Sequence, residues 1–177
     1  RIHQNGKKNR FKIRTRSYLN NNESFLELKQ KNNKNRTSKK RKKLDNSIPS
    51  DNQVIMSYVK KHVPDFSREL KKSLNIHFSR ITLADKNLTE RITIDLGLTY
   101  KRDMAEKSYP RLVIVEVKQD QYNHYSTIIK KLHERRIYPF RISKYCLGIY
   151  SLYSNDEVKK NMMKVKMRAL EKCLGTI

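Results

Sequence analysis

Lysine and arginine recur at every second position within residues 10–18, the spacing expected of phosphate-binding side chains on a β-strand. The residues that share this face are Lys12, Arg14, Arg16 and Tyr18. Alternate side chains of a strand project from the same side, so the three cations point together. A buried, unpaired cation is very costly. This face is therefore either solvated, as on an edge strand, or filled with anions.

Two further segments, 24–31 and 37–44, repeat the pattern and predict a second and a third strand. The second places Glu27 and Lys29 on one face. In the third segment, which is very basic, Lys39 and Arg41 share a face. Its inward register is open by one residue, and such a shift would turn Lys40 inward instead. From residue 10 to residue 43 the chain carries thirteen Lys or Arg and two acids, so cations are in large excess.

Two carboxylates precede a lysine by two residues on strand-like segments: Glu27 before Lys29, and Glu116 before Lys118. A carboxylate among cations can pair with them, or it can hold a divalent metal that bridges phosphate oxygens. The segment around Glu116 is nearly all apolar, which predicts a central strand and favours a buried site. A salt bridge of Glu116 with Lys118 or Arg111 is the alternative. Cations with a few carboxylates outline a phosphoryl-transfer site.

The remaining patterns predict further strands and several helices. Strands are expected over 75–84, 90–98 and 111–118, and helices over 52–63 (capped by Ser50 or Asp51), 65–74, 121–135, 144–150 and 156–174. In the first of these strands Arg80 shares a face with Phe78, and in the second Asp95 shares a face with Arg91. Ser143 is expected to cap the helix that begins at Lys144.

The totals set wider limits. The chain has 177 residues, which suits one domain, and its net charge is +24. The pI is near 10.1 and the mean hydropathy is −0.88. This charge attracts polyphosphate, nucleic acid or anionic lipid. No apolar run reaches the roughly 18 residues of a membrane span. There is no secretory signal, and Cys146 and Cys173 are expected to be reduced and buried, so we expect a cytoplasmic protein.

The order of six motifs resembles a known family. The motifs are Arg14-Thr15-Arg16, Phe25-Leu26-Glu27-Leu28-Lys29, Ser38-Lys39-Lys40-Arg41, Arg80, Val113-Ile114-Val115-Glu116-Val117-Lys118 and Ile142-Ser143-Lys144-Tyr145. Across about 10–150 they resemble the VTC domain, the catalytic domain of the vacuolar transporter chaperone polyphosphate polymerases and their bacterial relatives. That domain belongs to the CYTH-like triphosphate tunnel metalloenzymes.

The resemblance implies an α+β fold: an antiparallel β tunnel barrel with flanking helices. Its basic walls hold triphosphate or polyphosphate, and a divalent ion, Mn²⁺ or Mg²⁺, assists transfer of the ATP γ-phosphate onto polyphosphate. The family domain begins with strands that should precede residue 1. We therefore expect residues 1–177 to be a single VTC-like domain that is truncated at its N-terminus. The Glu-x-Glu-x-Lys signature of related tunnel phosphatases is absent.

Matched by position, the resemblance also assigns roles. The catalytic, phosphate-gripping residues would be Arg14, Arg16, Lys29 and Arg80. The further phosphate ligands would be Lys39, Ser143 and Lys144, joined on the same faces by Lys12, Arg41 and Lys118. Glu116 would be the metal ligand, and Glu27 is the second candidate for that role.

Other functions remain open at this stage. The same fold could hydrolyse tripolyphosphate or nucleoside triphosphates, with water in place of polyphosphate as the acceptor. A different class is a non-catalytic module that binds polyphosphate, inositol polyphosphate or nucleic acid. Sequence-specific RNA binding uses exposed aromatic side chains for stacking. The predicted sheet offers few and the chain has no Trp, which disfavours nucleic acid. The oligomeric state is open.

Overall fold

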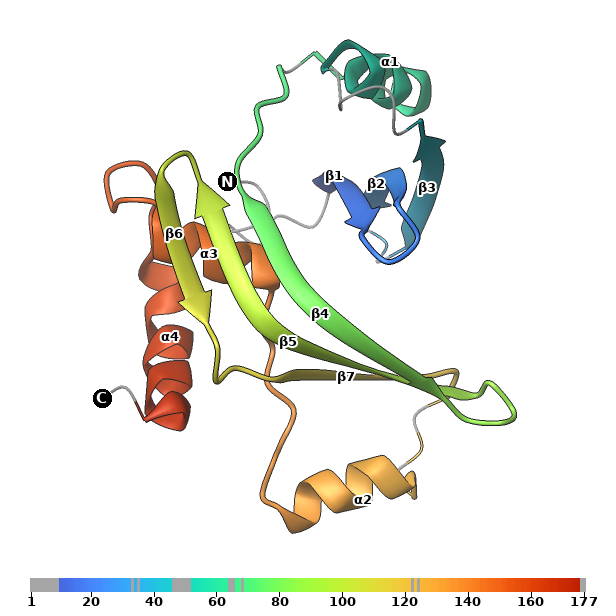
Figure 1. Cartoon of the computed structure of the whole chain (residues 1–177), viewed down its shortest axis with the longest axis vertical. Coiled ribbons are helices and arrows are strands. Elements are labelled where there is room, and N and C mark those ends of the chain that lie inside the picture. The colour runs from blue at the N-terminus through green and yellow to red at the C-terminus, as the bar shows by residue number, and fades with distance from the viewer. Residues whose placement is uncertain are drawn as a thin grey trace. The chain divides into compact units, whose positions relative to one another are not determined.

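The computed structural model describes residues 10–32, 34, 36–45, 52–63, 66–67, 69–121, 123 and 125–175. It is an α+β fold of antiparallel sheets with flanking helices (Figure 1). The chain divides into two compact units, Arg1–Lys72 and Ser73–Ile177, and each is described by itself. The described strands form one sheet in each unit, so the closed tunnel and the single domain stay predictions.

The first unit contains the three predicted strands, β1 (Arg10–Tyr18), β2 (Glu23–Lys31) and β3 (Thr37–Leu44). They form an antiparallel sheet in the order β1-β2-β3 (Figure 1). The first hairpin turns at Asn22, whose φ of 51° lies in the left-handed region that Asn tolerates. At the second hairpin, the Asn32 side chain accepts a hydrogen bond from the backbone N–H of Arg36 at 2.9 Å.

Helix α1 (Asn52–His62), which the apolar spacing predicted as a helix, packs on one face of this sheet. Leu26 and Leu28 of β2 are buried together with Tyr58 of α1. The predicted cap at Ser50 or Asp51 lies outside the described residues. Because the apolar core uses only one face of the sheet, the opposite face is left for the charged side chains.

The second unit is built on β4 (Asn75–Ala84), β5 (Glu90–Arg102), β6 (Ala105–Tyr109) and β7 (Ile114–Gln119). β5 pairs with all three other strands, and β6 was not predicted from the sequence. The prediction that the segment around Glu116 is a central strand is wrong, because among the described strands β7 pairs only with β5. Its apolar residues instead serve both faces of the sheet.

A bulge in β5 changes which side chains share a face. The pairing with β4 shifts by one residue between His77 and Ser79, and Gly97 on β5 has a φ of 63°. One extra residue in β5 turns the following side chains over. As a result, Leu98 and Tyr100 lie on the same face as Asp95, although strict alternation would place them opposite.

Beyond the bulge, this face carries the main core. Helices α3 (Lys144–Leu152) and α4 (Asn161–Leu174) supply Leu147 and Met167, which are buried with Leu98 and Tyr100. Gly148 allows the close approach, since an added Cβ would lie 2.3 Å from Cδ1 of Tyr100. Helix α3, whose start was predicted correctly, is thereby fixed against the sheet.

Several sequence-based expectations for the helices are wrong. The described residues of 65–74 are not helical, because the two ends pack separately: Phe66 meets Phe11 edge-on at 6.5 Å, and Leu74 joins the core of the second unit. The helix expected over 121–135 is α2 (Thr127–Glu134) only. It begins late because Ser126 caps it, accepting from the backbone N–H of Ile129 at 3.5 Å.

The last predicted helix also begins later than expected, at Asn161, since residues 155–157 form a turn. Cys146 is buried as predicted, but Cys173 is exposed, because it lies on the outer side of α4. Both cysteines are free.

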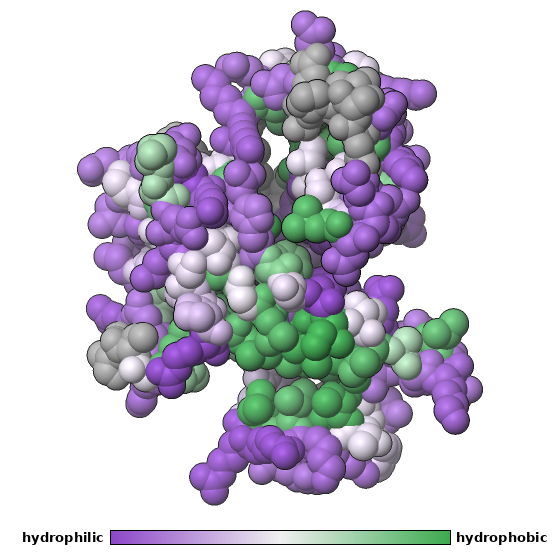
Figure 2. All heavy atoms as spheres, viewed as in Figure 1, coloured by the Kyte–Doolittle hydropathy of each residue, from purple (hydrophilic) through white to green (hydrophobic). Residues whose placement is uncertain are grey.

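The second sheet also has an apolar face on the side opposite to helices α3 and α4. Figure 2 shows hydrophobic side chains gathered where β4, β5 and β7 cross. On these neighbouring strands, Ile81, Leu83 and Val115 are exposed. None of the helices in the described part of the chain has the length and apolar character that a membrane span requires.

Candidate functional site

The first unit presents a basic face, formed by alternate side chains of β1, β2 and β3. Lys12, Lys29 and Lys39 stand in one row across the three strands, because Lys29 pairs with both of the others. This register answers the question left open by the sequence: Lys39 lies on the basic face, and Lys40 lies on the face that carries Leu28.

The next row of the basic face contains its central carboxylate. Glu27 pairs with Arg14 on one side and with Arg41 on the other. It accepts a hydrogen bond from Nε of Arg14 at 2.6 Å. Burial alone would raise the pKa of Glu27, but the Arg14 hydrogen bond and the surrounding positive charges hold it below its ordinary value. Glu27 therefore stays ionised and neutralises one of the cations beside it.

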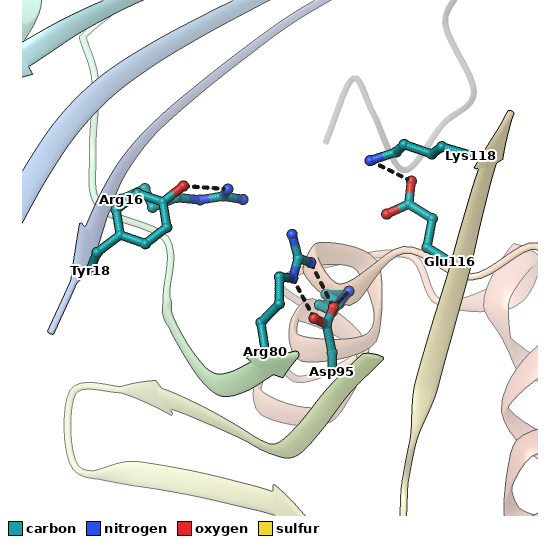
Figure 3. A network of polar contacts seen from close by, with 7 residues as sticks. Arg16, Tyr18, Arg80, Asp95, Glu116 and Lys118 are labelled. Atoms are coloured by element: carbon teal, nitrogen blue, oxygen red, sulfur yellow. Dashed lines mark hydrogen bonds and ion pairs between the residues drawn. The ribbon is translucent and has the colours of Figure 1, made fainter. Parts of the chain in front are cut away.

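The third row adds aromatic rings to the basic face. The Arg41 guanidinium lies over the ring of Phe25 at 3.5 Å from the centroid, a cation–π contact. Arg16 donates to the hydroxyl of Tyr18 at 3.2 Å, as Figure 3 shows. Tyr18 in turn meets Phe25 edge-on at 6.0 Å. These contacts orient the guanidinium groups without neutralising them.

Cations outnumber carboxylates on this face. The described cations of the basic face are Lys12, Arg14, Arg16, Lys29, Lys31, Lys39, Arg41 and Lys43. The described carboxylates are Glu23, which pairs with Lys43 at 2.6 Å, and Glu27. The balance among these side chains is +6, so the basic face attracts anions.

The second unit gathers its polar side chains on the face that also carries its core. Arg80 pairs with Asp95, and Glu116 pairs with Thr93, two residues before Asp95 in β5. Lys118 pairs with Arg91 at the next position on this face. The pairings bring together three predicted site residues, Arg80, Glu116 and Lys118.

Arg80 and Lys144 share one buried carboxylate. Asp95 is only 2% exposed and accepts from Nε of Arg80 at 2.5 Å and from Nη2 at 2.8 Å (Figure 3). Nζ of Lys144 lies 2.5 Å from Oδ2 of the same carboxylate. Burial alone would raise the pKa of Asp95, but the hydrogen bonds and charges of Arg80 and Lys144 hold it below its ordinary value.

Lys144 is the first residue of α3, and Ser143 caps that helix. The Ser143 hydroxyl accepts from the backbone N–H of Cys146 at 3.5 Å. The predicted cap is therefore confirmed. A helix N-terminus favours negative charge, so α3 adds to the positive potential around Lys144.

Glu116 differs from the expectation of a buried site. Its side chain is 50% exposed, and its carboxylate lies 3.2 Å from Nζ of Lys118 (Figure 3). The salt bridge considered from the sequence is present. The pair is exposed because β7, among the described strands, lies at an edge of the sheet. An exposed ion pair contributes only about 0–1 kcal/mol to stability.

Two charged residues of this face were not among the predicted site residues. Arg91 lies in line with Glu116 and Lys118, and its place on the face followed from alternation. Asp95 lies between Arg80 and Lys144, but a single Asp in an alternating strand carries no signal of a partner on a distant helix.

The chain matches the VTC domain over residues 1–153, most of its length. It belongs to the VTC domain family. No curated protein and no solved structure matches the chain. The VTC domain family is associated with polyphosphate synthesis.

The VTC domain family also implies a divalent metal. Within the described part of the chain, no three His, Cys, Asp or Glu side chains come together to hold one. Mg²⁺ in phosphate sites is commonly bound by one or two carboxylates plus phosphate oxygens. Glu116 is half exposed and would have to release Lys118 to bind in that mode, whereas Glu27 is less exposed and would have to release Arg14. The described residues fit an ion that arrives with phosphates, and they do not form an all-protein metal cage.

Proposed function

We propose that this chain is a polyphosphate polymerase-like phosphotransferase, which moves the γ-phosphate of ATP onto polyphosphate. The observation that carries the proposal is the excess of cations, in rows, on the sheet faces of a VTC-family chain. Phosphoryl transfer needs positioning and charge neutralisation more than covalent chemistry from the protein. Rows of cationic side chains at strand spacing can position phosphates and neutralise their charge.

The basic face of the first unit suits a chain of phosphates. Lys12, Lys29 and Lys39 act as point charges at successive strands, and strands lie about 4.8 Å apart. Arg14 and Arg16 can each grip phosphate oxygens in a bidentate manner. Arg41, held by its ring contact, contributes a guanidinium of fixed orientation.

The cations of the second unit suit the phosphates of the nucleotide. Arg80 and Lys144 are held side by side through Asp95, and Ser143 caps α3 beside them. Backbone N–H groups at a helix start bind phosphate. Lys118, which is 45% exposed, would add a further cation on β7. Closure of the strands into a tunnel is part of this proposal and rests on the family.

We assign the metal-binding role to Glu116, with Glu27 as the second candidate. The ion, Mn²⁺ or Mg²⁺, would neutralise the charge that builds on the phosphate oxygens during transfer. Glu116 would reach the ion by releasing Lys118, and the cost is small because that pair is half exposed.

The test is to incubate the chain with ATP and Mn²⁺ and to look for long polyphosphate on a gel. Glu116→Gln should abolish product while leaving tripolyphosphate binding, measured by calorimetry, within about threefold of the starting value. A matched control is Glu106→Gln, which removes an exposed carboxylate that pairs with Lys101 elsewhere on the sheet. The control should retain activity.

The same experiment separates the alternatives. Free orthophosphate without polymer would make the protein a hydrolase of the same fold. Tight binding of tripolyphosphate without turnover, unchanged by Glu116→Gln, would make it a polyanion-binding module and overturn the catalytic proposal.

A further inference from the structure

Asp95 is the most buried carboxylate among the described residues of the second unit, and it has two cationic partners. One partner, Arg80, comes from the neighbouring strand. The other, Lys144, comes from the start of α3, far along the chain. Burying a charge is very costly unless it is paired, and three contacts to Asp95 oxygens supply that pairing.

A second group holds the same two cations. The ring of Phe78 lies 5.2 Å from the guanidinium carbon of Arg80 and 5.3 Å from Nζ of Lys144. Both distances are within the range of cation–π attraction. Asp95 and Phe78 therefore act on the same pair, and together they offset the repulsion that two neighbouring cations exert on each other.

Asp95 fixes the orientation of the two cations but lowers their combined positive charge. Two parallel hydrogen bonds to one carboxylate define the plane of the Arg80 guanidinium. The same carboxylate cancels one of the two positive charges, so it weakens the long-range attraction for phosphate. A site selected only for affinity would do without it.

We propose that Asp95 is a positioning residue, which orients Arg80 and Lys144 as one phosphate clamp. The inference rests on the proposed function, because the clamp acts on the transferred phosphates. Asp95 does not touch substrate. It sets where the two cations stand, and misplacing such groups by 1 Å can cost about 100-fold in rate.

The experiment compares Asp95→Asn with the starting protein and with Glu106→Gln as the matched control. Asparagine keeps the size of the side chain but removes the charge, and its amide cannot accept from both cations through two oxygens. We expect turnover of ATP to fall by at least about tenfold, while the Kd for tripolyphosphate stays within about threefold or becomes tighter. Loss of affinity in proportion to turnover, or turnover like that of the control, would overturn the proposal.

A second measurement keeps the inference separate from the proposed function. Nε of Arg80 can be followed by NMR, because its hydrogen bond to Asp95 slows exchange of that proton with water. Asp95→Asn should speed this exchange by at least about tenfold, while the Nε signals of exposed arginines stay unchanged. If the starting protein makes no polyphosphate, the proposed function fails, and the exchange rate alone then tests whether Asp95 positions Arg80. An unchanged rate would overturn the positioning role.

Discussion

The two units hold their cations in opposite ways. On the basic face of the first unit, eight described cations share two carboxylates, and the central pair of Arg14 with Glu27 is partly exposed. In the second unit, Arg80 and Lys144 converge on a carboxylate that is only 2% exposed. The first arrangement gives a large net positive charge, and the second gives two cations of fixed orientation.

This difference indicates a division of labour. An exposed excess of charge attracts a polyanion and is weakened by salt. A buried, hydrogen-bonded pair holds its geometry and is screened much less. We infer that the basic face sets how strongly polyphosphate is held, and that Arg80 and Lys144 set where the reacting phosphate stands.

The largest effect is expected from Arg80→Ala. Removing one partner of a buried pair leaves a poorly compensated charge, so the second unit should lose about 2–4 kcal/mol of stability. The matched change in the first unit, Arg14→Ala, breaks a partly exposed pair and should cost less than about 1 kcal/mol. Hydrogen exchange of peptides from β4 and β5, compared with peptides from β1 and β2, measures both. Equal losses in the two units would remove the contrast.

The second effect concerns pH. The pKa of Asp95 in the folded chain lies below its ordinary value of 3.8. Ionised Asp95 therefore stabilises the fold above about pH 4, and this contribution is lost as the pH falls from there toward the folded pKa. Urea unfolding between about pH 2 and 6, followed by circular dichroism, should show a shallower acid dependence for Asp95→Asn than for the starting protein. Parallel curves would show that Asp95 is not held ionised by its partners.

The third effect tests the register of β3. Lys39 lies on the basic face and its neighbour Lys40 lies on the other face. One screened charge contact is worth about 1 kcal/mol, so Lys39→Ala should weaken tripolyphosphate binding about fivefold at low salt. Lys40→Ala should have a smaller effect, and salt should reduce the difference. Isothermal calorimetry at two ionic strengths measures both variants, and equal effects would mean that charge acts diffusely.

The smallest effect is expected from Glu27→Gln. Because its partner Arg14 is more than half exposed, the stability of the first unit should change by less than about 1 kcal/mol. Without metal, tripolyphosphate should bind up to about threefold more tightly, since the variant releases Arg14. Repeating the titration with Mn²⁺ tests the second metal ligand. A loss of affinity only with Mn²⁺ would assign the metal to Glu27.

The sequence predicted best where structure is local. Strands β1, β2 and β3 follow from alternation and from Asn-rich turns, because each hairpin joins neighbouring segments. Their basic face followed as well. The register of Lys39 did not, because the pairing of β2 with β3 decides it and alternation alone is ambiguous by one residue.

The sequence predicted least where distant segments meet. β6 is short and polar, so nothing in its composition indicates a strand. The contact of Asp95 with Lys144 joins β5 to the start of α3, and no local pattern connects them. Glu116 was expected in a buried site from its apolar neighbours, but those neighbours also mark an exposed apolar face and an edge strand.

The bulge at Gly97 divides β5 into two halves, which differ in whether odd-numbered or even-numbered side chains point to the core face. Before it, odd-numbered residues such as Asp95 face the clamp, and after it, even-numbered residues such as Tyr100 face the core under α3. Deleting one residue here would leave the composition almost unchanged. It would nevertheless move the side chains of one half of the strand to the opposite face of the sheet. The constraint on this segment is therefore one of length. Relatives could vary the side chains on either side of position 97, provided that they keep the count of residues between the clamp and the core.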